Sequence, residues 1–314
     1  MSSIRLILHG KAAHDPRVET ALTTVREAGR VVEVVVTTKA GDAAHFAREA
    51  VDDARTGQVT TIIAGGGDGT INEVFGAALE AEPPAGCSFA VLPLGTANDF
   101  SKSIGVPADD LTAAMMIAAG DTARPIDVGR FDGRPFFNMA TGGFGARVTA
   151  ETDPELKKRL GGLAYLLTGV SRFRDLSSSS GRFRAEGFEW EGAFIAVAIG
   201  NGRQAGGGVV LCPGAILDDG LLELTILPEL TGSERATALL EWMRPDTTGV
   251  PDAIAKTVRS PWIEFTGDAP LFVNLDGEPV KKRKFRAECQ PRCLLLHVGP
   301  DATGFAPLAG PPAS

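Results

Sequence analysis

Residues 60–74 read TTIIAGGGDGTINEV and join a β-branched run to a glycine-rich turn and then to a helical pattern. Residues 60–64 predict a buried strand, and Thr70 and Glu73 have the spacing of a capping box, so a helix is predicted to begin at Thr70. Exposed backbone N–H groups, the positive end of a helix and glycines that permit close approach together favour phosphate binding. The turn therefore predicts a nucleotide site between a strand and a helix.

This turn does not follow two common nucleotide-binding signatures. Thr70 stands where the dinucleotide fingerprint has its third glycine, and the Gly-Lys-Ser/Thr ending of the P-loop is absent. Asp68 is informative because polyphosphate repels a carboxylate unless a Mg²⁺ ion lies between them or a hydroxyl group donates to the carboxylate. The alternative is a plain strand–turn–helix connection in which Asp68 bonds its own backbone.

Around this turn, the first 125 residues alternate strand-like and helix-like segments. Strands are predicted at residues 4–8, 31–36, 60–64 and 89–92. Helices are predicted at residues 16–28, 42–54 (with Asp42 as N-cap), 70–79 and 109–119. This alternation is typical of a parallel sheet covered by helices on both faces. We therefore expect a doubly wound, Rossmann-like α/β domain over residues 1–125.

From residue 126 onward the helical patterns become rare. Strands are predicted at residues 135–139, 181–188, 193–198, 221–226, 262–265, 271–274 and 294–297, and helices at 154–170 and 233–242. Gly, Asp and Pro between the strands are typical of an antiparallel sheet. A β-rich, sandwich-like domain is expected over residues 126–300, with a loose tail over 301–314.

A second loop, residues 93–100, reads PLGTANDF and follows the strand predicted at 89–92. Loops at the carboxyl ends of parallel strands line one crevice, so this loop is expected to face the glycine turn. Thr96 offers a hydroxyl to a phosphate or a base, and Asn98 and Asp99 offer polar groups to a substrate hydroxyl. Taken alone, the loop is better explained as an ordinary N-cap loop, because Asn and Asp favour caps, but together with the glycine turn it indicates a site.

The composition excludes several classes of partner. Lys and Arg number 31 against 39 Asp and Glu, a net charge of −8 that argues against a nucleic-acid partner. No apolar run approaches the roughly 18 residues that span a membrane, and the N-terminus lacks a signal-peptide pattern. We expect a cytoplasmic protein, and nothing in the sequence indicates a protein partner.

Six motifs follow one another along the chain. They are the glycine turn, PLGTANDF, FFNMATGGFGAR (136–147), GNGRQAGGG (200–208), DDGLLEL (218–224) and NLDGEP (274–279). In this order they resemble the diacylglycerol-kinase-type lipid kinases. The glycine turn alone is less specific, because NAD kinases and phosphofructokinases carry a similar Gly-Gly-Asp-Gly; PLGTANDF and NLDGEP set the lipid kinases apart.

The resemblance implies roles for particular residues. An ATP site is implied at Thr37, Gly66, Gly67, Asp68, Gly69, Thr70, Ile71, Asn72, Glu73 and Thr96. A site for Mg²⁺, Ca²⁺ or another divalent cation is implied at Asp219, with the backbone carbonyls of Ile216 and Leu221 as fellow ligands, which suits the preference of hard cations for oxygen. Residues 218–220 are otherwise a plain turn between strands.

The same resemblance implies transfer of the γ-phosphate of ATP to a hydroxyl of a glycerolipid, with phosphatidylglycerol and diacylglycerol as candidates. Glu278 is then the proton acceptor, and Asp68 organises Mg²⁺ directly or through water. Asp276 is a competing base on the same loop. A soluble-metabolite kinase of the NAD-kinase kind and a non-catalytic nucleotide-sensing module are the alternatives. His9-Gly10-Lys11 replaces the Asn-Pro or Asn-Gly of many relatives, so the role of the first loop stays open.

A lipid kinase must also reach its bilayer. A basic run follows Glu278 and comprises Lys281, Lys282, Arg283, Lys284 and Arg286. Each such residue contributes about 1 kcal/mol at an anionic surface. We expect the run to mediate peripheral contact with the inner face of the membrane, with a solvated hairpin as the alternative. A leucine stripe over residues 156–170 predicts either an interfacial helix or a core helix.

Overall fold

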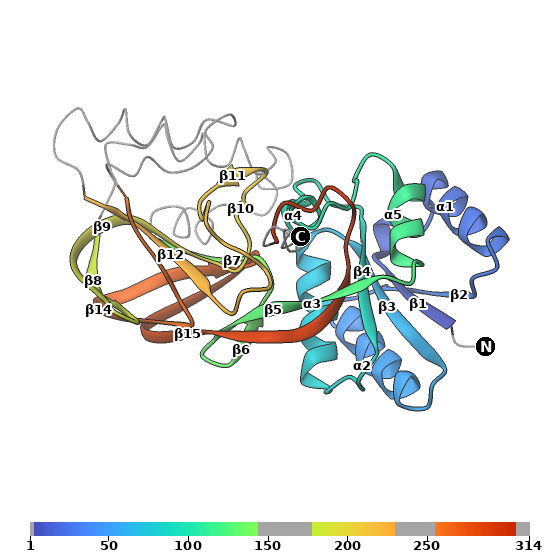
Figure 1. The fold of residues 1–314 in the computed structure, drawn as a ribbon, viewed down its shortest axis with the longest axis horizontal. Helices are drawn as coiled ribbons and strands as arrows, with labels where there is room; N and C mark the ends of the chain where they lie inside the picture. Colours follow the sequence, from blue (N-terminus) through green and yellow to red (C-terminus); the bar gives the residue numbers. More distant parts are fainter. Residues whose placement is uncertain (1–2, 144–177, 230–254, 306–314) are drawn as a thin grey trace, which may run out of the picture.

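The structure is a computed structural model that describes residues 3–143, 178–229 and 255–305. Its N-terminal part is built on four parallel strands in the order β2-β1-β3-β4 (Figure 1). Their bounds are β1 Ser3–Leu8, β2 Val32–Val36, β3 Val59–Gly66 and β4 Ser88–Pro93. The four strands predicted here are confirmed. Because they are parallel, all their carboxyl ends meet at one edge of the sheet.

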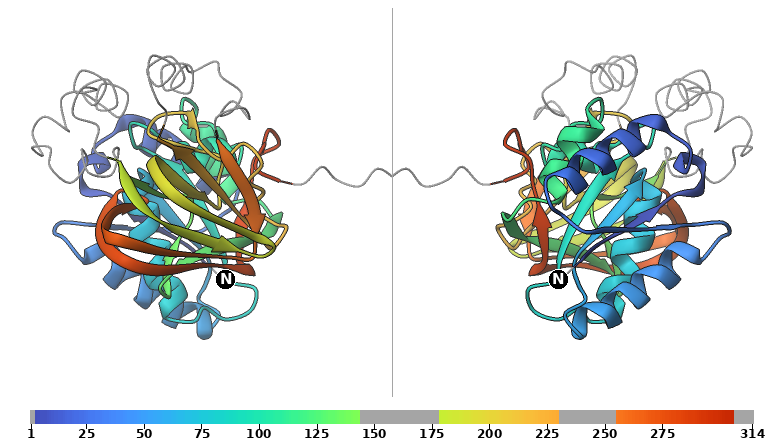
Figure 2. Two further views of the ribbon diagram at one scale, coloured as in Figure 1. Left: turned by 90° about the vertical axis from the view of Figure 1, so that its left-hand side faces the viewer. Right: turned by 90° about the vertical axis from the view of Figure 1, so that its right-hand side faces the viewer.

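Helices lie on both sides of this sheet. They are α1 Pro16–Glu27, α2 Asp42–Arg55, α3 Asp68–Glu80, α4 Asp99–Ser103 and α5 Leu111–Ala118, with a 3₁₀ helix η1 at Gly10–Ala12. Helices α1 and α5 pack together on one side, and α2 and α3 pack together on the other (Figures 1 and 2). Aliphatic side chains that are buried on both faces of the strands form the core between these layers.

Two predictions about helix starts are wrong. Helix α3 begins at Asp68, not at Thr70, with Gly67 as an N-cap that has no side-chain bond. Thr70 lies inside the first turn and packs on Gly66, where an added Cβ atom would come within 2.3 Å of the Thr70 Oγ1 atom. Asp42 is the first residue of α2, and the N-cap is Gly41 at φ 86°. The Asp42 carboxylate accepts from the N–H of Thr38 in the preceding loop instead of capping the helix.

The rest of the described chain is almost entirely β-structure. Its strands are β5 Ala123–Phe131, β6 Arg134–Phe136, β7 Met139–Gly143, β8 Ser179–Ala185, β9 Phe188–Gly200, β10 Gln204–Ala205, β11 Val209–Val210, β12 Leu222–Pro228, β13 Lys256–Ser260, β14 Trp262–Leu275 and β15 Glu278–His297. Both β7 and β8 pair antiparallel with β9 and with β14, so the sheet curls on itself. Phe183, Phe194 and Phe265 fill the interior. The expected β-rich second part is confirmed.

Two long strands differ from the prediction. Residues 262–265 and 271–274 belong to one strand, β14, which has a register shift between Thr266 and Leu271. Residues 294–297 are only the end of the 20-residue strand β15. The first half of β15 contains the basic run. Both faces of this half are largely exposed, so charged residues occupy both, and the alternation of apolar and polar residues that predicts a strand is missing. Strand β5 was not predicted.

Strand β15 joins the two parts. Its first half pairs with β14, and its second half pairs with β5 and, in parallel, with β4 (Figure 1). In the left view of Figure 2 the orange and red strands curve around the yellow-green ones. Residue 125, the expected domain boundary, falls within β5. The helices expected at 154–170 and 233–242, and the last residues of the tail, lie outside the described residues.

Candidate active site

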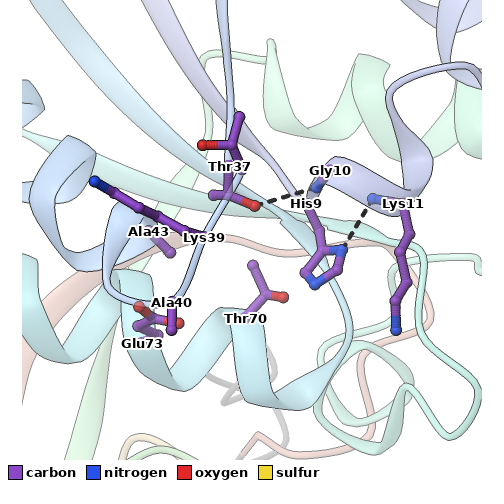
Figure 3. Close-up of a pocket in the computed structure, with 10 residues that line it drawn as sticks. His9, Gly10, Lys11, Thr37, Lys39, Ala40, Ala43, Thr70 and Glu73 are labelled. Atoms are coloured by element: carbon purple, nitrogen blue, oxygen red, sulfur yellow. Dashed lines mark hydrogen bonds between the residues drawn. The ribbon is translucent and has the colours of Figure 1, made fainter.

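A cavity of about 470 Å³ lies where the loops after β1 and β2 meet the first turns of α2 and α3 (Figure 3). Its lining consists of His9, Gly10, Lys11, Thr37, Thr38, Lys39, Ala40, Ala43, Thr70 and Glu73. Thr37, Thr70 and Glu73 are among the predicted site residues. The others were not predicted as site residues, although the rule that loops at the carboxyl ends of parallel strands line one crevice applies equally to the loops after β1 and β2.

The loop after β1 is tied to the loop after β2. The backbone N–H of Gly10 donates to the Thr37 hydroxyl at 3.1 Å. A Cβ atom at Gly10 would lie 2.3 Å from the Thr37 carbonyl oxygen, so no larger residue fits there. The Nδ1 atom of His9 accepts from the N–H of Lys11 at 3.2 Å and caps η1. These contacts hold residues 9–11 in the wall of the cavity. The sequence had left the role of this first loop undecided.

Asp42 holds the loop that carries Thr37. Its Oδ2 atom accepts from the Thr38 N–H at 2.7 Å, from the Thr38 hydroxyl at 2.8 Å and from the Lys39 N–H at 3.0 Å. The hydrogen bond from the Thr38 backbone contributes most to a pKa of Asp42 below its ordinary value. Asp42 therefore acts as an anchor of the cavity wall.

The glycine turn touches the second loop, as expected. A Cβ atom at Gly95 would lie 2.5 Å from the Gly67 Cα atom, so the two backbones are in direct contact. Asn98, at φ 50°, closes the second loop on itself: its side chain accepts from the Gly95 N–H and donates to the Gly95 carbonyl, both at 2.9 Å. Thr96 is exposed between them.

Within the glycine turn, the first N–H groups of α3 lie at residues 68–70. These groups have no intrahelical partner, because a helix leaves its first donors unpaired. The N–H of Ile71 already donates to the Gly67 carbonyl at 3.1 Å. The side chains of Ile71 and Asn72 are buried and face away from solvent. The first turn therefore offers backbone donors to an anion, mainly from Asp68, Gly69 and Thr70.

Asp68 binds the next loop and not its own backbone. Its carboxylate accepts from the N–H of Phe100 at 3.2 Å and from that of Asp99 at 3.4 Å, at the start of α4. A carboxylate has about four acceptor positions, so capacity remains after these two bonds. An oxygen-rich acceptor of this kind suits hydrated Mg²⁺, which usually keeps several of its waters.

The β14–β15 hairpin turns on Asp276 and Gly277, whose φ angles of 46° and 102° are those of a two-residue type I′ turn. The Asp276 carboxylate accepts from the N–H groups of Phe137 at 2.6 Å and Met139 at 2.7 Å, and from Asn138. Burial raises the pKa of Asp276 to about 6, and the charge of Asp68 adds to the increase. The hairpin is also tied to the helix of the glycine turn, because the Phe137 ring packs against Phe75 of α3 at 5.5 Å.

Glu278 is the residue that follows this turn. Its side chain is 53 % exposed and forms an ion pair with the guanidinium of Arg134 on β6. Asp276, the competing base of the sequence analysis, is occupied by three backbone donors. Glu278 is the more accessible of the two carboxylates.

Asp219, where the resemblance implies a divalent cation, lies just before β12. Its Oδ2 atom forms an ion pair with Arg259 of β13, and its Oδ1 atom accepts from the Leu221 N–H at 3.1 Å. Among the described residues, no three His, Cys, Asp or Glu side chains gather as a metal-binding group. The guanidinium of Arg259 thus contacts the carboxylate at which the resemblance implies a divalent cation.

Comparisons with known proteins cover nearly the whole chain. Residues 4–131 match the diacylglycerol kinase catalytic domain, and residues 138–298 match the YegS C-terminal NAD kinase beta sandwich-like domain. A protein of Pseudomonas aeruginosa named "Probable lipid kinase YegS-like" is 47 % identical over 295 residues, 94 % of each chain. A protein of Xanthomonas oryzae pv. oryzae with the same name is 45 % identical, over 95 % of this chain and 96 % of its own.

A solved structure adds the fold. The crystal structure of a diacylglycerol kinase from Bacillus anthracis has a TM-score of 0.74 at 20 % identity and covers 96 % of this chain and 98 % of its own. No helix in the described ranges is long and apolar enough to span a membrane. The two family models and the high identity to the relatives agree with the motifs found in the sequence. The chain belongs to the YegS-like lipid kinases, which combine a diacylglycerol kinase catalytic domain with a YegS C-terminal domain.

Proposed function

We propose that this lipid kinase transfers the γ-phosphate of ATP to a hydroxyl group of a membrane glycerolipid, with phosphatidylglycerol and diacylglycerol as the candidate acceptors. One observation carries the proposal. The Asp276 carboxylate accepts from the Phe137 N–H at 2.6 Å, and the Phe137 ring packs edge-on against Phe75 of α3 at 5.5 Å, so the hairpin that bears Glu278 is tied to the helix that begins in the glycine turn. Phosphoryl transfer to an alcohol depends on a bound phosphate donor and is assisted by a positioned base.

In this proposal the cavity beside Thr37 and Thr70 receives the nucleotide. The free N–H groups at the start of α3 and the positive end of that helix stabilise the phosphates. Lys11 and Lys39, which line the cavity, add positive charge. Bound Mg²⁺ supplies charge neutralisation on the phosphates, and Asp68 is the residue that would hold it, directly or through water.

Glu278 accepts the proton of the lipid hydroxyl as that oxygen bonds to the γ-phosphorus and the bond to the β–γ bridging oxygen breaks. The products are a phosphorylated lipid, ADP and a proton held on the Glu278 carboxyl. Arg134 orients the carboxylate through the ion pair. The hydrogen bonds of Asp276 hold the hairpin in place, so the position of Glu278 is set by its neighbour two residues earlier.

The direct test is a kinase assay with γ-labelled ATP, Mg²⁺ and mixed-lipid vesicles, followed by separation of the lipids. We expect the wild type to label a glycerolipid, and Glu278→Gln to lower turnover by 10²–10⁴-fold with nucleotide binding unchanged, as removal of a general base typically does. Glu288→Gln, a change of an exposed carboxylate farther along β15, is the matched control and keeps activity.

Other outcomes identify the alternatives. Labelled NAD without labelled lipid would place the chain with soluble-metabolite kinases. ATP binding that is intact in the wild type, with no product from either acceptor, would indicate a sensing module. Full lipid kinase activity in Glu278→Gln would show that another group takes the proton.

We also propose that the basic run orients the kinase at the membrane. Within it, Lys282 pairs with Asp132 at 2.9 Å, and Arg286 pairs with Glu264 and Glu288, both at 2.7 Å. Lys281, Arg283 and Lys284 are exposed, with Lys281 over the ring of Phe272. These three residues are therefore the ones to test.

The triple change of Lys281, Arg283 and Lys284 to Gln should weaken binding to anionic vesicles by on the order of a hundredfold, from about 1 kcal/mol for each charge. Arg182 and Arg184 on β8, which pair with Glu191 and Glu264, provide a control when both are changed to Gln. Vesicle sedimentation measures both variants. Equal binding of the triple variant and the wild type would mean that the run is a solvated hairpin.

A further inference from the structure

The turn at residues 218–220 is held by side chains from two other strands. Asp218 forms an ion pair with Arg124 of β5 at 2.8 Å. The N–H of Gly220 donates to the Oδ2 atom of Asp127, also on β5, at 2.6 Å. The positive φ of Gly220, 78°, shapes the turn so that its N–H points at that buried carboxylate.

Asp219 completes this arrangement on the side of β13. One carboxylate oxygen contacts the guanidinium of Arg259, and the other accepts from the Leu221 N–H at 3.1 Å. The side chain of Arg259 is 35 % exposed and that of Asp219 is 20 % exposed, so the pair is partly shielded from water. Arg259 pairs with Glu223 in the β12–β13 ladder. This register places Arg259 of β13 beside the residues that precede β12.

Acidic and basic residues lie together around the turn. Asp127, Asp218 and Asp219 are the acidic groups, and Arg124, Arg259 and Arg292 are the basic ones; the N–H of Arg292 also donates to Asp127 at 2.8 Å. A divalent cation at Asp219 would add positive charge directly beside a guanidinium, which repels it at short range. Arginine stays protonated at every pH at which the protein folds, so this repulsion persists.

We infer that the guanidinium of Arg259 takes the place of a divalent cation at Asp219, so that the turn is held in its conformation without a metal ion. The site implied by the family resemblance is then an ion pair in this chain. Any divalent cation that the reaction uses is bound elsewhere, with the nucleotide. The Asp219 turn is separate from Glu278 and from the residues proposed to hold the nucleotide.

The test is calcium and magnesium titration of the full chain, free of nucleotide, by isothermal titration calorimetry, together with thermal unfolding in EDTA and in millimolar CaCl₂. We expect the wild type to show no binding that depends on Asp219 and to have the same melting temperature in both solutions. Arg259→Gln, which removes the charge, should bind Ca²⁺, and its melting temperature should rise by several degrees with saturating Ca²⁺.

Three variants control this result. Asp219→Asn in the Arg259→Gln background should abolish the new binding. Arg259→Lys, which keeps a positive charge, should behave like the wild type. Arg182→Gln breaks an exposed arginine–carboxylate pair of 2.6 Å on β8 and should gain no cation site.

Two results would overturn the inference. Wild-type binding of Ca²⁺ or Mg²⁺ that Asp219→Asn removes would establish a metal site despite Arg259. A folded Arg259→Gln protein that binds neither cation would show that the vacated carboxylate is no cation site. If Arg259→Gln does not fold, the comparison of the wild type with Asp219→Asn still decides whether Asp219 holds a metal.

Discussion

At the scale of single residues, aspartates of the site hold the backbone of neighbouring loops. Asp42 binds the loop that follows β2, Asp68 binds the start of α4, and Asp276 binds residues 137–139. A carboxylate that accepts several N–H groups fixes a loop without a regular ladder, and charge-assisted bonds of this kind are among the stronger ones. Asp68 keeps acceptor capacity beyond its two backbone bonds, and the Glu278 side chain is 53 % exposed.

Glu223 provides a pH-dependent prediction at this scale. The residue is 4 % exposed on β12, and burial raises its pKa to about 7 from an ordinary value of 4.5, against the lowering effect of the Gly214 and Ala215 N–H groups. Because the folded pKa lies above the unfolded one, its stabilising contribution is complete below pH 4.5 and is lost as the pH rises through 7.

Glu223→Gln keeps the shape of the protonated side chain and cannot ionise. The variant should therefore exceed the wild type in free energy of unfolding by about 2 kcal/mol above pH 7, and by less as the pH falls toward 4.5. Urea unfolding of both proteins across this range measures the difference. Parallel pH profiles would mean that Glu223 is not the group responsible.

At the scale of elements, the site is a contact between loops from separate parallel strands. The glycine turn after β3 and the loop after β4 touch through Gly67 and Gly95: a Cβ atom at Gly95 would lie 2.5 Å from the Gly67 Cα atom, and one at Gly67 would lie 3.0 Å from the Gly95 Cα atom. The β14–β15 hairpin, from the other part of the chain, is tied to α3 through Phe137, whose ring packs against Phe75. Close backbone approach is thus the reason for glycine at these two positions.

Gly95→Ala tests this contact. The new Cβ atom would lie 2.5 Å from the Gly67 Cα atom and 2.8 Å from the Asn98 Oδ1 atom, so the loops must separate. Overpacking of this kind costs about 1–3 kcal/mol, and we expect roughly tenfold weaker ATP binding by calorimetry.

Gly76→Ala in α3 is the matched control for that experiment. Its Cβ atom would meet only Pro135, at an ordinary 3.6 Å, and alanine stabilises a helix interior by about 1 kcal/mol relative to glycine. This variant should bind ATP like the wild type. If both variants bind equally well, the contact between the loops does not shape the nucleotide site.

At the scale of the whole molecule, β15 belongs to both parts. Its first half lies beside β14 over a core of phenylalanines, and its end pairs with β4 and β5 beside the core of the N-terminal part. Leu294 and Leu296 belong to that N-terminal core. Loss of order in either part would therefore expose hydrogen-bonding groups in the other.

We expect the full chain to unfold in a single cooperative transition, with Leu296→Ala lowering that transition as a whole. Leu296 is 0 % exposed, and a buried Leu→Ala change costs about 2–5 kcal/mol. Calorimetry, with comparison of calorimetric and van't Hoff enthalpies, measures this. Two separate transitions, with only one of them shifted, would show that the parts unfold independently.

The sequence alone determined the order of the first strands and helices, the glycine turn, the second loop and the family, because these depend on local periodicity and on residue types at fixed spacing. It did not determine the long strand β15, whose charged residues mask its alternation, nor the start of α3, where Thr70 packs on Gly66. Only the tertiary structure added His9 and Lys11 to the cavity of Thr37 and Thr70 and brought Arg259 to Asp219. Those contacts join residues far apart in the chain, and short-range patterns carry no information about such pairs.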